Sequence, residues 1–226
     1  MRSVLRIGHR GAAGYAAENT LAAIRKGIAL GVDFIEVDVR CTADGVLVIL
    51  HDETVNRTTN GKGRVDRLSL REIKNLNAGN GESIPTLEEV LNVVKGKAGL
   101  MVELKITGAA RQAVEAVREA EFRGPVIYAS FLHEELAPVR ASDPAASLMV
   151  LFGRLPRTPV ACAIAYGPSH VGLRHDTATP ALVDTFHQAG LRVFVYTADA
   201  LDDIQHAVSL AVDGIISNFP DRIAPP

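Results

Sequence analysis

Cysteine is scarce in this sequence, with only Cys41 and Cys162 among 226 residues. The two are far apart and lack the spacing of a metal site, which argues against a disulfide framework and against a cysteine-bound zinc. Two reduced thiols are typical of a protein in a reducing compartment.

Long apolar runs are also missing. No stretch approaches the roughly 18 residues that a membrane-spanning helix requires. The stretch MRSVLRIGHRG has only a short apolar segment, broken by Arg6, and no cleavage-site pattern. We therefore expect a cytoplasmic protein with no stable membrane insertion.

An excess of charge of one sign is absent as well. The 24 basic and 26 acidic residues give a formal net charge of −2, and no basic cluster interrupted by aromatic residues occurs. This composition gives no electrostatic basis for binding nucleic acid. A small-molecule ligand remains the expected partner, and a homodimer is the one assembly that the sequence leaves open.

Short β-rich runs alternate with helix-patterned segments along the chain, which has no linker or low-complexity segment. The β-rich runs are 4–9, 34–39, 99–105, 125–131, 147–152, 169–173, 191–197 and 214–217, and the helical segments are 20–31, 86–96, 110–124, 180–190 and 200–214. This alternation predicts an α/β protein with a parallel sheet.

Eight strands and this length favour a (β/α)₈ TIM barrel, in a single domain spanning residues 1–226. An open doubly wound sheet is the alternative fold. It is less favoured because no glycine-rich nucleotide loop follows the first run; GHRGAAG has the wrong spacing and carries His9 and Arg10.

The apolar run 46–50 does not fit the parallel pattern. Seven residues separate Asp38 from Val46, too few for a parallel crossover, and Asp44-Gly45 is a hairpin turn signal. We expect a hairpin extension after the second strand that returns His51 to the level of Asp38. The following polar stretch is long for a loop, so residues of about 46–85 are predicted to form a small insertion at the barrel mouth.

Acidic residues interrupt two apolar strands. Glu36 and Asp38 share one face of the second predicted strand, and Glu103 and Lys105 share one face of the third. Pairing between Glu103 and Lys105 would explain one strand. The same pattern on two strands favours three carboxylates around a hard divalent cation at the carboxyl-terminal rim.

Two histidines are predicted at the same rim. His9 ends the first strand, and the hairpin delivers His51. They are candidates for a general acid and base; zinc ligation is the alternative, but it would leave no acid–base pair. Arg10 and Lys105 would then donate to an anionic group, and the whole set suits phosphodiester chemistry.

The order of the motifs resembles the glycerophosphodiester phosphodiesterase family over essentially the whole chain. The similarity lies in HRG at 9–11, AENT at 17–20, EVDV at 36–39, TADG at 42–45, HD at 51–52, RTT at 57–59, IPTLEEVL at 84–91, ELK at 103–105, SF at 130–131 and DGIISNFPD at 213–221.

The resemblance implies a (β/α)₈ barrel that hydrolyses glycerophosphodiesters to sn-glycerol 3-phosphate and an alcohol. It implies one divalent cation, Mg²⁺ or Ca²⁺, held by Glu36, Asp38 and Glu103. It implies acid–base roles for His9 and His51 and phosphate contacts for Arg10 and Lys105. In one route for the family, the glycerol 2-hydroxyl attacks the phosphorus and water opens the resulting cyclic phosphate.

Some positions depart from the family pattern. Tyr196 stands where relatives often have tryptophan, Asn218 where many have aspartate, and Ala17 where they have proline. Tyr196 and Phe131 are candidate substrate contacts, although packing alone would explain either. Glu18, Asn19 and Asp52 are expected to brace loops or to orient His51.

Two other functions keep the same barrel. One is a phosphodiesterase of the lysophospholipase D type, which would need an exposed apolar rim for its lipid; no strong amphipathic helix provides one. The other is a barrel that binds phosphodiesters without turnover, against which the intact histidines and acids argue.

Overall fold

Eight parallel strands close into a barrel in the computed structural model, which describes residues 4–223. Strand β1 pairs with both β2 and β9, so the sheet has no open edge along this circuit. The predicted TIM barrel is confirmed; residues 1–3 and 224–226 of the predicted domain 1–226 lie outside the described residues. The parallel strands are β1 (Leu5–Gly8), β2 (Phe34–Cys41), β4 (Gly99–Leu104), β5 (Val126–Ser130), β6 (Ser147–Phe152), β7 (His170–Arg174), β8 (Arg192–Tyr196) and β9 (Gly214–Ser217).

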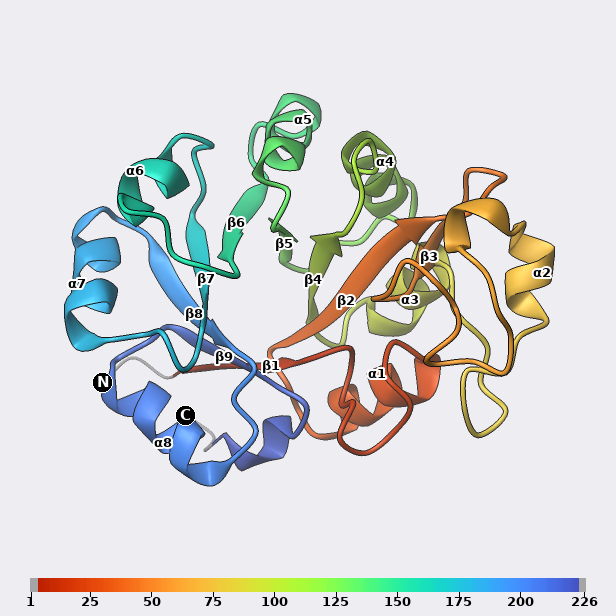
Figure 1. The fold of residues 1–226 in the computed structure, drawn as a ribbon, viewed down its shortest axis with the longest axis horizontal. Coiled ribbons are helices and arrows are strands. Elements are labelled where there is room, and N and C mark those ends of the chain that lie inside the picture. The colour runs from red at the N-terminus through yellow and green to blue at the C-terminus, as the bar shows by residue number, and fades with distance from the viewer. Residues whose placement is uncertain (1–3, 224–226) are drawn as a thin grey trace.

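Helices surround the strands (Figure 1). They are α1 (Leu21–Ala29), α3 (Leu87–Val94), α4 (Ala110–Glu119), α5 (Leu136–Ser142), α6 (Pro159–Ile164), α7 (Pro180–Gln188) and α8 (Leu201–Ser209). Thr86 caps α3 in a reciprocal pair with Glu89. The short helices α5 and α6 were not predicted. None of the helices in residues 4–223 has the length and apolar character that crossing a membrane requires.

Strand β3 (Leu47–Ile49) returns antiparallel along β2, with Val39 opposite Ile49. The amide of Leu50 donates a hydrogen bond of 2.9 Å to the carbonyl of Asp38. His51 therefore follows directly at the level of Asp38, and the predicted hairpin is confirmed.

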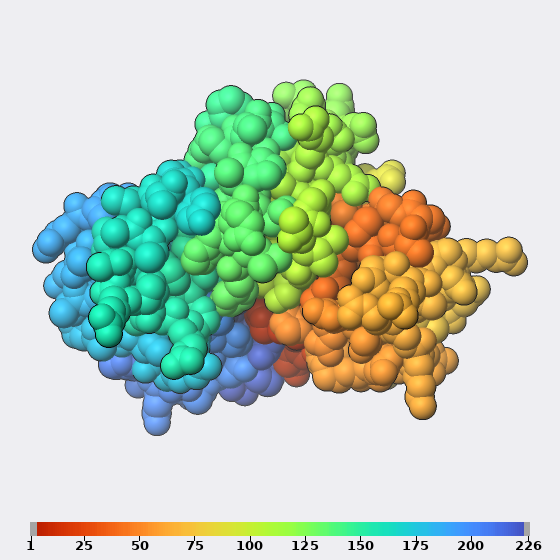
Figure 2. All heavy atoms as spheres, turned by 45° about the horizontal axis from the view of Figure 1, so that its top comes forward, coloured from red at the N-terminus to blue at the C-terminus, as the bar shows by residue number. Residues whose placement is uncertain are grey.

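The residues after β3 form a small unit with its own apolar centre. It contains a 3₁₀ turn (Val65–Arg67) and helix α2 (Leu70–Lys74), and its orange to yellow atoms lie at the right of the molecule in Figure 2. Its buried side chains are Leu50, Val55, Val65, Ile73, Ala78 and Ile84, which pack with Val48 of β3. This internal packing gives the loop that carries His51 a rigid support.

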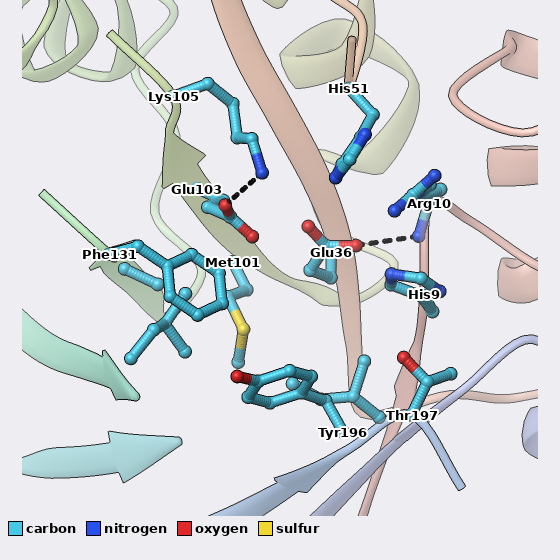
Figure 3. Close-up of a pocket in the computed structure, with 13 residues that line it drawn as sticks. His9, Arg10, Glu36, His51, Met101, Glu103, Lys105, Phe131, Tyr196 and Thr197 are labelled. Atoms are coloured by element: carbon cyan, nitrogen blue, oxygen red, sulfur yellow. Dashed lines mark hydrogen bonds and ion pairs between the residues drawn. The ribbon is translucent and has the colours of Figure 1, made fainter. Parts of the chain in front are cut away.

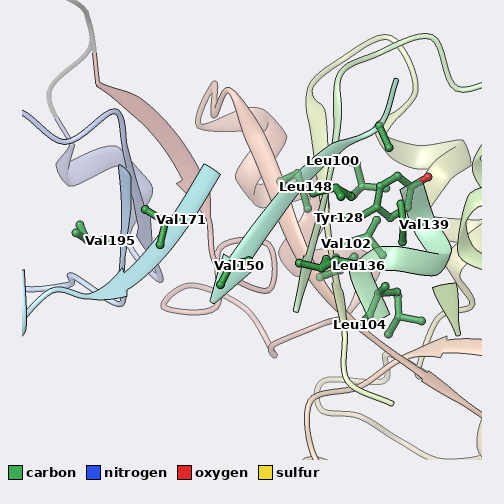
Figure 4. Close-up of a cluster of buried hydrophobic side chains, with 14 of the residues drawn as sticks. Leu100, Val102, Leu104, Tyr128, Leu136, Val139, Leu148, Val150, Val171 and Val195 are labelled. Carbon is green, nitrogen blue, oxygen red and sulfur yellow. The ribbon is translucent and has the colours of Figure 1, made fainter. Parts of the chain in front are cut away.

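Strand periodicity divides the remaining core into two layers. One set of apolar side chains fills the barrel, among them Ile7, Met101 and Phe194. The opposite set, such as Val102 and Leu148, packs outward against the helices (Figure 4). Because apolar packing supports both faces of the strands, the rim can tolerate buried charge.

We predict that Leu148→Ala lowers the free energy of unfolding by about 2–5 kcal/mol, because it leaves a cavity between β6 and the helices. Leu148 has no exposed surface. Leu201→Ala is the matched control: this side chain is 57% exposed, so its loss should change stability by no more than about 0.5 kcal/mol. Urea unfolding measures both, and equal effects would contradict the assigned packing.

Candidate active site

The loop after β1 is tightly wound. Arg10 adopts a positive φ of 52° and Gly11 one of 88°. A Cβ atom at Gly11 would lie 2.5 Å from the backbone of Ala23 in α1, so only glycine fits there. This close approach holds His9 and Arg10 at the mouth of the barrel.

The three predicted carboxylates converge because of strand register. Asp38 on β2 pairs with Glu103 on β4, so their side chains point to the same face, and Glu36 lies one step back on that face. Ligand oxygens of the three lie within 4.8 Å of one another. Glu36 and Asp38 are 3% and 1% exposed.

The clustering of two buried acids and the partly buried Glu103 changes their proton affinities. Burial and the charges of Asp38 and Glu103 raise the pKa of Glu36 well above its ordinary value. Burial and Asp38 raise the pKa of Glu103 to about 7. Burial also opposes the charge of Asp38, but Lys105 and Arg10 hold its pKa below the ordinary value. Asp38 is therefore the most strongly ionised of the three.

Two cations neutralise part of this charge. Lys105 Nζ lies 2.6 Å from Glu103 Oε1 and 3.5 Å from Asp38, so the pairing named as an alternative in the sequence is present. Arg10 Nε lies 3.3 Å from Asp38. One carboxylate oxygen is left over: Glu36 Oε1 is buried without a hydrogen-bond partner. Ion pairing therefore leaves one oxygen of the three carboxylates without a partner.

Both predicted histidines border these acids, and Figure 3 shows their rings on the side of Glu36 and Arg10. His9 Nδ1 lies 2.8 Å from Asn218 Oδ1, and His51 Nδ1 lies 2.7 Å from Asp52 Oδ1. Burial and the charge of Arg10 lower the pKa of His9 to about 4, which keeps its ring neutral at neutral pH.

A cavity of about 200 Å³ opens at this rim. Eight of the nine residues singled out in the sequence line it, and Asp38 lies beneath, bonded to Asn19 and paired with the two cations. The structure thus brings all nine together. The lining residues are His9, Arg10, Glu36, His51, Met101, Glu103, Lys105, Ala129, Phe131, Leu151, Tyr196, Thr197 and Ile216.

Aromatic rings form one wall of the cavity. Phe131 and Tyr196 meet edge to face with centroids 5.8 Å apart, and Lys105 Nζ lies 5.6 Å from the Phe131 centroid. The Tyr196 hydroxyl donates to the carbonyl of Phe152 at 2.8 Å. The hydroxyl is therefore engaged within the protein, and Tyr196 offers the cavity its ring.

Two residues near the site were not recognised in the sequence. Arg57 bridges the loop of Asp52 and the loop of Glu18, with hydrogen bonds of 2.7–3.0 Å to both carboxylates. Asp199, after β8, contacts Asn218. Arg57 lies in the RTT motif, which contributed to the family resemblance but indicated no role for this residue. Asp199 carried no signal, because its partner is distant in the sequence.

Comparison with known proteins identifies the family of this chain. The family model described as the glycerophosphoryl diester phosphodiesterase family matches residues 9–222. The chain belongs to this family. It is 35% identical over 239 residues to a glycerophosphodiester phosphodiesterase of Caldanaerobacter subterraneus subsp. tengcongensis, covering 96% of this chain and 95% of that relative.

Solved structures agree with the family match. A phosphodiesterase of Oleispira antarctica, in complex with the product sn-glycerol-3-phosphate, is 27% identical with a TM-score of 0.90, covering 99% of this chain and 95% of that one. A glycerophosphodiester phosphodiesterase of Agrobacterium tumefaciens is 31% identical with a TM-score of 0.86 and 99% coverage of both chains. The predicted glycerophosphodiester phosphodiesterase family and enzyme class are confirmed.

The raised pKa of Glu103 predicts a stability cost in the metal-free protein. A carboxyl group whose pKa is higher in the folded state favours folding while it is protonated. This contribution is full below the ordinary value of 4.5 and is lost as the pH rises through about 7. In EDTA, we therefore expect Glu103→Gln to be more stable than the parent chain at about pH 8, with a smaller difference at about pH 5.

Urea unfolding at the two pH values checks this expectation. Glu115→Gln, an exposed position on α4, is the matched control and should follow the parent chain at both. A Glu103→Gln variant that loses stability equally at both pH values would show that the carboxylate pairs favourably with Lys105 and carries no excess charge.

Proposed function

We propose that this chain hydrolyses glycerophosphodiesters to sn-glycerol 3-phosphate and an alcohol, with one bound divalent cation and two histidines as general acid and base. One observation carries the proposal: two imidazoles, two cationic side chains, Glu36 and Glu103 line a single cavity at the carboxyl-terminal rim of a barrel of this family, and Asp38 completes the carboxylate cluster beside it. Barrel enzymes place their reacting groups at this rim.

Glu36, Asp38 and Glu103 would hold the cation. The partnerless buried oxygen of Glu36 and the surplus of carboxylates over cations fit this role. Purely carboxylate donors favour a hard ion, Mg²⁺ or Ca²⁺, over zinc. When bound, the ion supplies a Lewis acid that neutralises charge developing on phosphate oxygens.

Arg10 and Lys105 are the proposed phosphate contacts. Both line the cavity, and both are paired with the acids that would hold the ion. Binding of a divalent cation to those acids would free their N–H groups to donate to phosphate oxygens. Phe131 and Tyr196 would contact the carbon skeleton of the substrate through their rings.

His9 and His51 are the proposed acid–base pair. Each is held through Nδ1 by a neighbouring side chain, which leaves Nε2 to exchange a proton with the substrate. Attack on phosphorus requires a proton acceptor for the attacking oxygen and a donor for the departing alcohol. Two imidazoles facing one cavity provide one of each.

The cavity favours a small substrate over a lysophospholipid. Its volume of about 200 Å³ lies below the 300 Å³ or so at which pockets for drug-sized ligands begin. A glycerol phosphate group is small and polar, whereas an acyl chain would need a longer apolar groove. We propose that the chain acts as a single catalytic domain with residues of about 46–85 as its insertion; the cytoplasmic location and the homodimer stay predictions.

We predict that the chain with Mg²⁺ or Ca²⁺ releases glycerol 3-phosphate from several glycerophosphodiesters and that EDTA stops this release. An enzyme-coupled assay of glycerol 3-phosphate measures it across head groups. Glycerophosphocholine should be cleaved faster than lysophosphatidylcholine. The reverse order would favour the lysophospholipase D alternative, and binding without release from any substrate would favour a non-catalytic barrel.

Two substitutions separate chemistry from metal binding. His51→Ala should lower kcat by about 10²–10⁴-fold because it removes a proton-transfer group, while the affinity for the cation stays near that of the parent chain. Glu36→Gln should weaken the cation itself, which titration calorimetry reports directly. Retained turnover in His51→Ala would remove its acid–base role, and unchanged cation affinity in Glu36→Gln would count against ligation.

A further inference from the structure

Strand register places Asn218 beside His9. Strands β1 and β9 pair in parallel with Gly8 opposite Ser217, so the next residue on each strand, His9 or Asn218, leaves the sheet at the same level. The backbone amide of His9 donates to the carbonyl of Ser217, and the amide of Gly14 donates to the carbonyl of Asn218. Both side chains are therefore fixed at their bases.

Asp199 determines which way the Asn218 amide faces. Asp199 Oδ2 lies 2.7 Å from Asn218 Nδ2, and Asp199 Oδ1 accepts from the Asn218 backbone amide at 2.8 Å. A carboxylate can only accept hydrogen bonds, so the NH₂ group of Asn218 must face Asp199. Asn218 Oδ1 is then the atom that faces His9 Nδ1, at 2.8 Å.

The Ser217 hydroxyl is a third hydrogen-bond donor to the Asp199 carboxylate. The backbone amide of Phe219 donates to Ser217 Oγ at 3.1 Å, so the Ser217 hydroxyl turns its own hydrogen to Asp199 Oδ1, 3.0 Å away. Ser217 has no exposed surface. The hydrogen bonds therefore run in one direction, from the backbone to Asp199, and they allow only one orientation of the Asn218 amide.

We propose that Asp199 and Asn218 are positioning residues that fix the tautomer of His9, with the proton on Nδ1 and a free lone pair on Nε2 facing the cavity. An amide oxygen can only accept, so His9 Nδ1 must donate. Nδ1–H is the less favoured tautomer of a free imidazole, so the protein must impose it. The inference deepens the proposed function, on which it rests, by making His9 the proton acceptor of the pair.

The proton balance follows from this assignment. The attacking hydroxyl oxygen bonds to phosphorus, and its proton passes to His9 Nε2. The bond between phosphorus and the alcohol oxygen breaks, and that oxygen takes a proton from His51. His51 is held by the carboxylate of Asp52, which stabilises a charged ring, whereas His9 is held by a neutral amide. The two different partners suit His51 as the proton donor and His9 as the proton acceptor.

An isosteric substitution tests the orientation. Asp199→Asn keeps an oxygen for Ser217 but places an NH₂ group against the NH₂ group of Asn218, so the Asn218 amide should turn and present NH₂ to His9. We expect the His9 proton to move to Nε2. We also expect kcat to fall by about 10²–10⁴-fold with little change in KM, as when a donor replaces the acceptor behind a catalytic histidine.

The double variant Asp199→Asn/Asn218→Asp is the rescue. It exchanges the two groups, so the new amide at position 199 donates and the new carboxylate at position 218 accepts from His9 Nδ1. We expect the Nδ1–H tautomer to return and kcat to recover by at least about tenfold over the single variant, a coupling that independent sites would not show. Asp202→Asn, an exposed position on α8, is the matched control and should leave both readouts unchanged.

Long-range ¹H–¹⁵N correlation spectra of the full chain with Mg²⁺ report the tautomer directly, at about pH 8, above the ordinary imidazole pKa. A His9→Ala variant identifies the His9 signals. A proton on Nε2 in the parent chain, or a double variant no better than the single one, overturns the inference. An Nδ1 proton in a chain that releases no glycerol 3-phosphate would support the tautomer and refute the proposed function instead.

Discussion

Three neighbouring carboxylates, two of them buried, are the constraint on which the rest of the site depends, because they cannot all be charged together without positive charge nearby. Glu36, Asp38 and Glu103 face one another inside the barrel, and two cations balance only part of their charge. Removing such groups from water is costly unless opposite charge is near. The surrounding loops therefore supply Arg10 and Lys105, and one oxygen of Glu36 is left without a hydrogen-bond partner.

The barrel makes this arrangement possible because its two layers of apolar packing lie away from the rim. Strand pairing sets Asp38 beside Glu103, and the hairpin of β2 and β3 sets His51 beside both. Arg57 then ties the loop of His51 to the loop of Arg10 through Asp52 and Glu18. The acids come from rigid strands, while the groups proposed to move protons sit on braced loops, which suits precise chemistry.

Local patterns in the sequence predicted much of this structure. Period-two alternation placed the acids inside, and the seven-residue gap before Val46 excluded a parallel crossover and predicted the hairpin. Helices α5 and α6 were missed because seven and six residues give too little periodicity. The bridge of Arg57 and the contact of Asp199 with Asn218 could not be predicted, since each depends on which loops meet after the barrel closes.

The different partners of the two histidines follow from the same electrostatic constraint. A carboxylate in the place of Asn218 would add a further negative charge next to a ring that lines the same cavity as Glu36. A neutral amide supplies the acceptor without that charge, but an amide can turn and an unpaired one would not select a tautomer. Asp199 removes this freedom because its carboxylate holds the NH₂ group of Asn218. A neutral side chain at Asn218 is therefore consistent with a site that already holds three carboxylates close together.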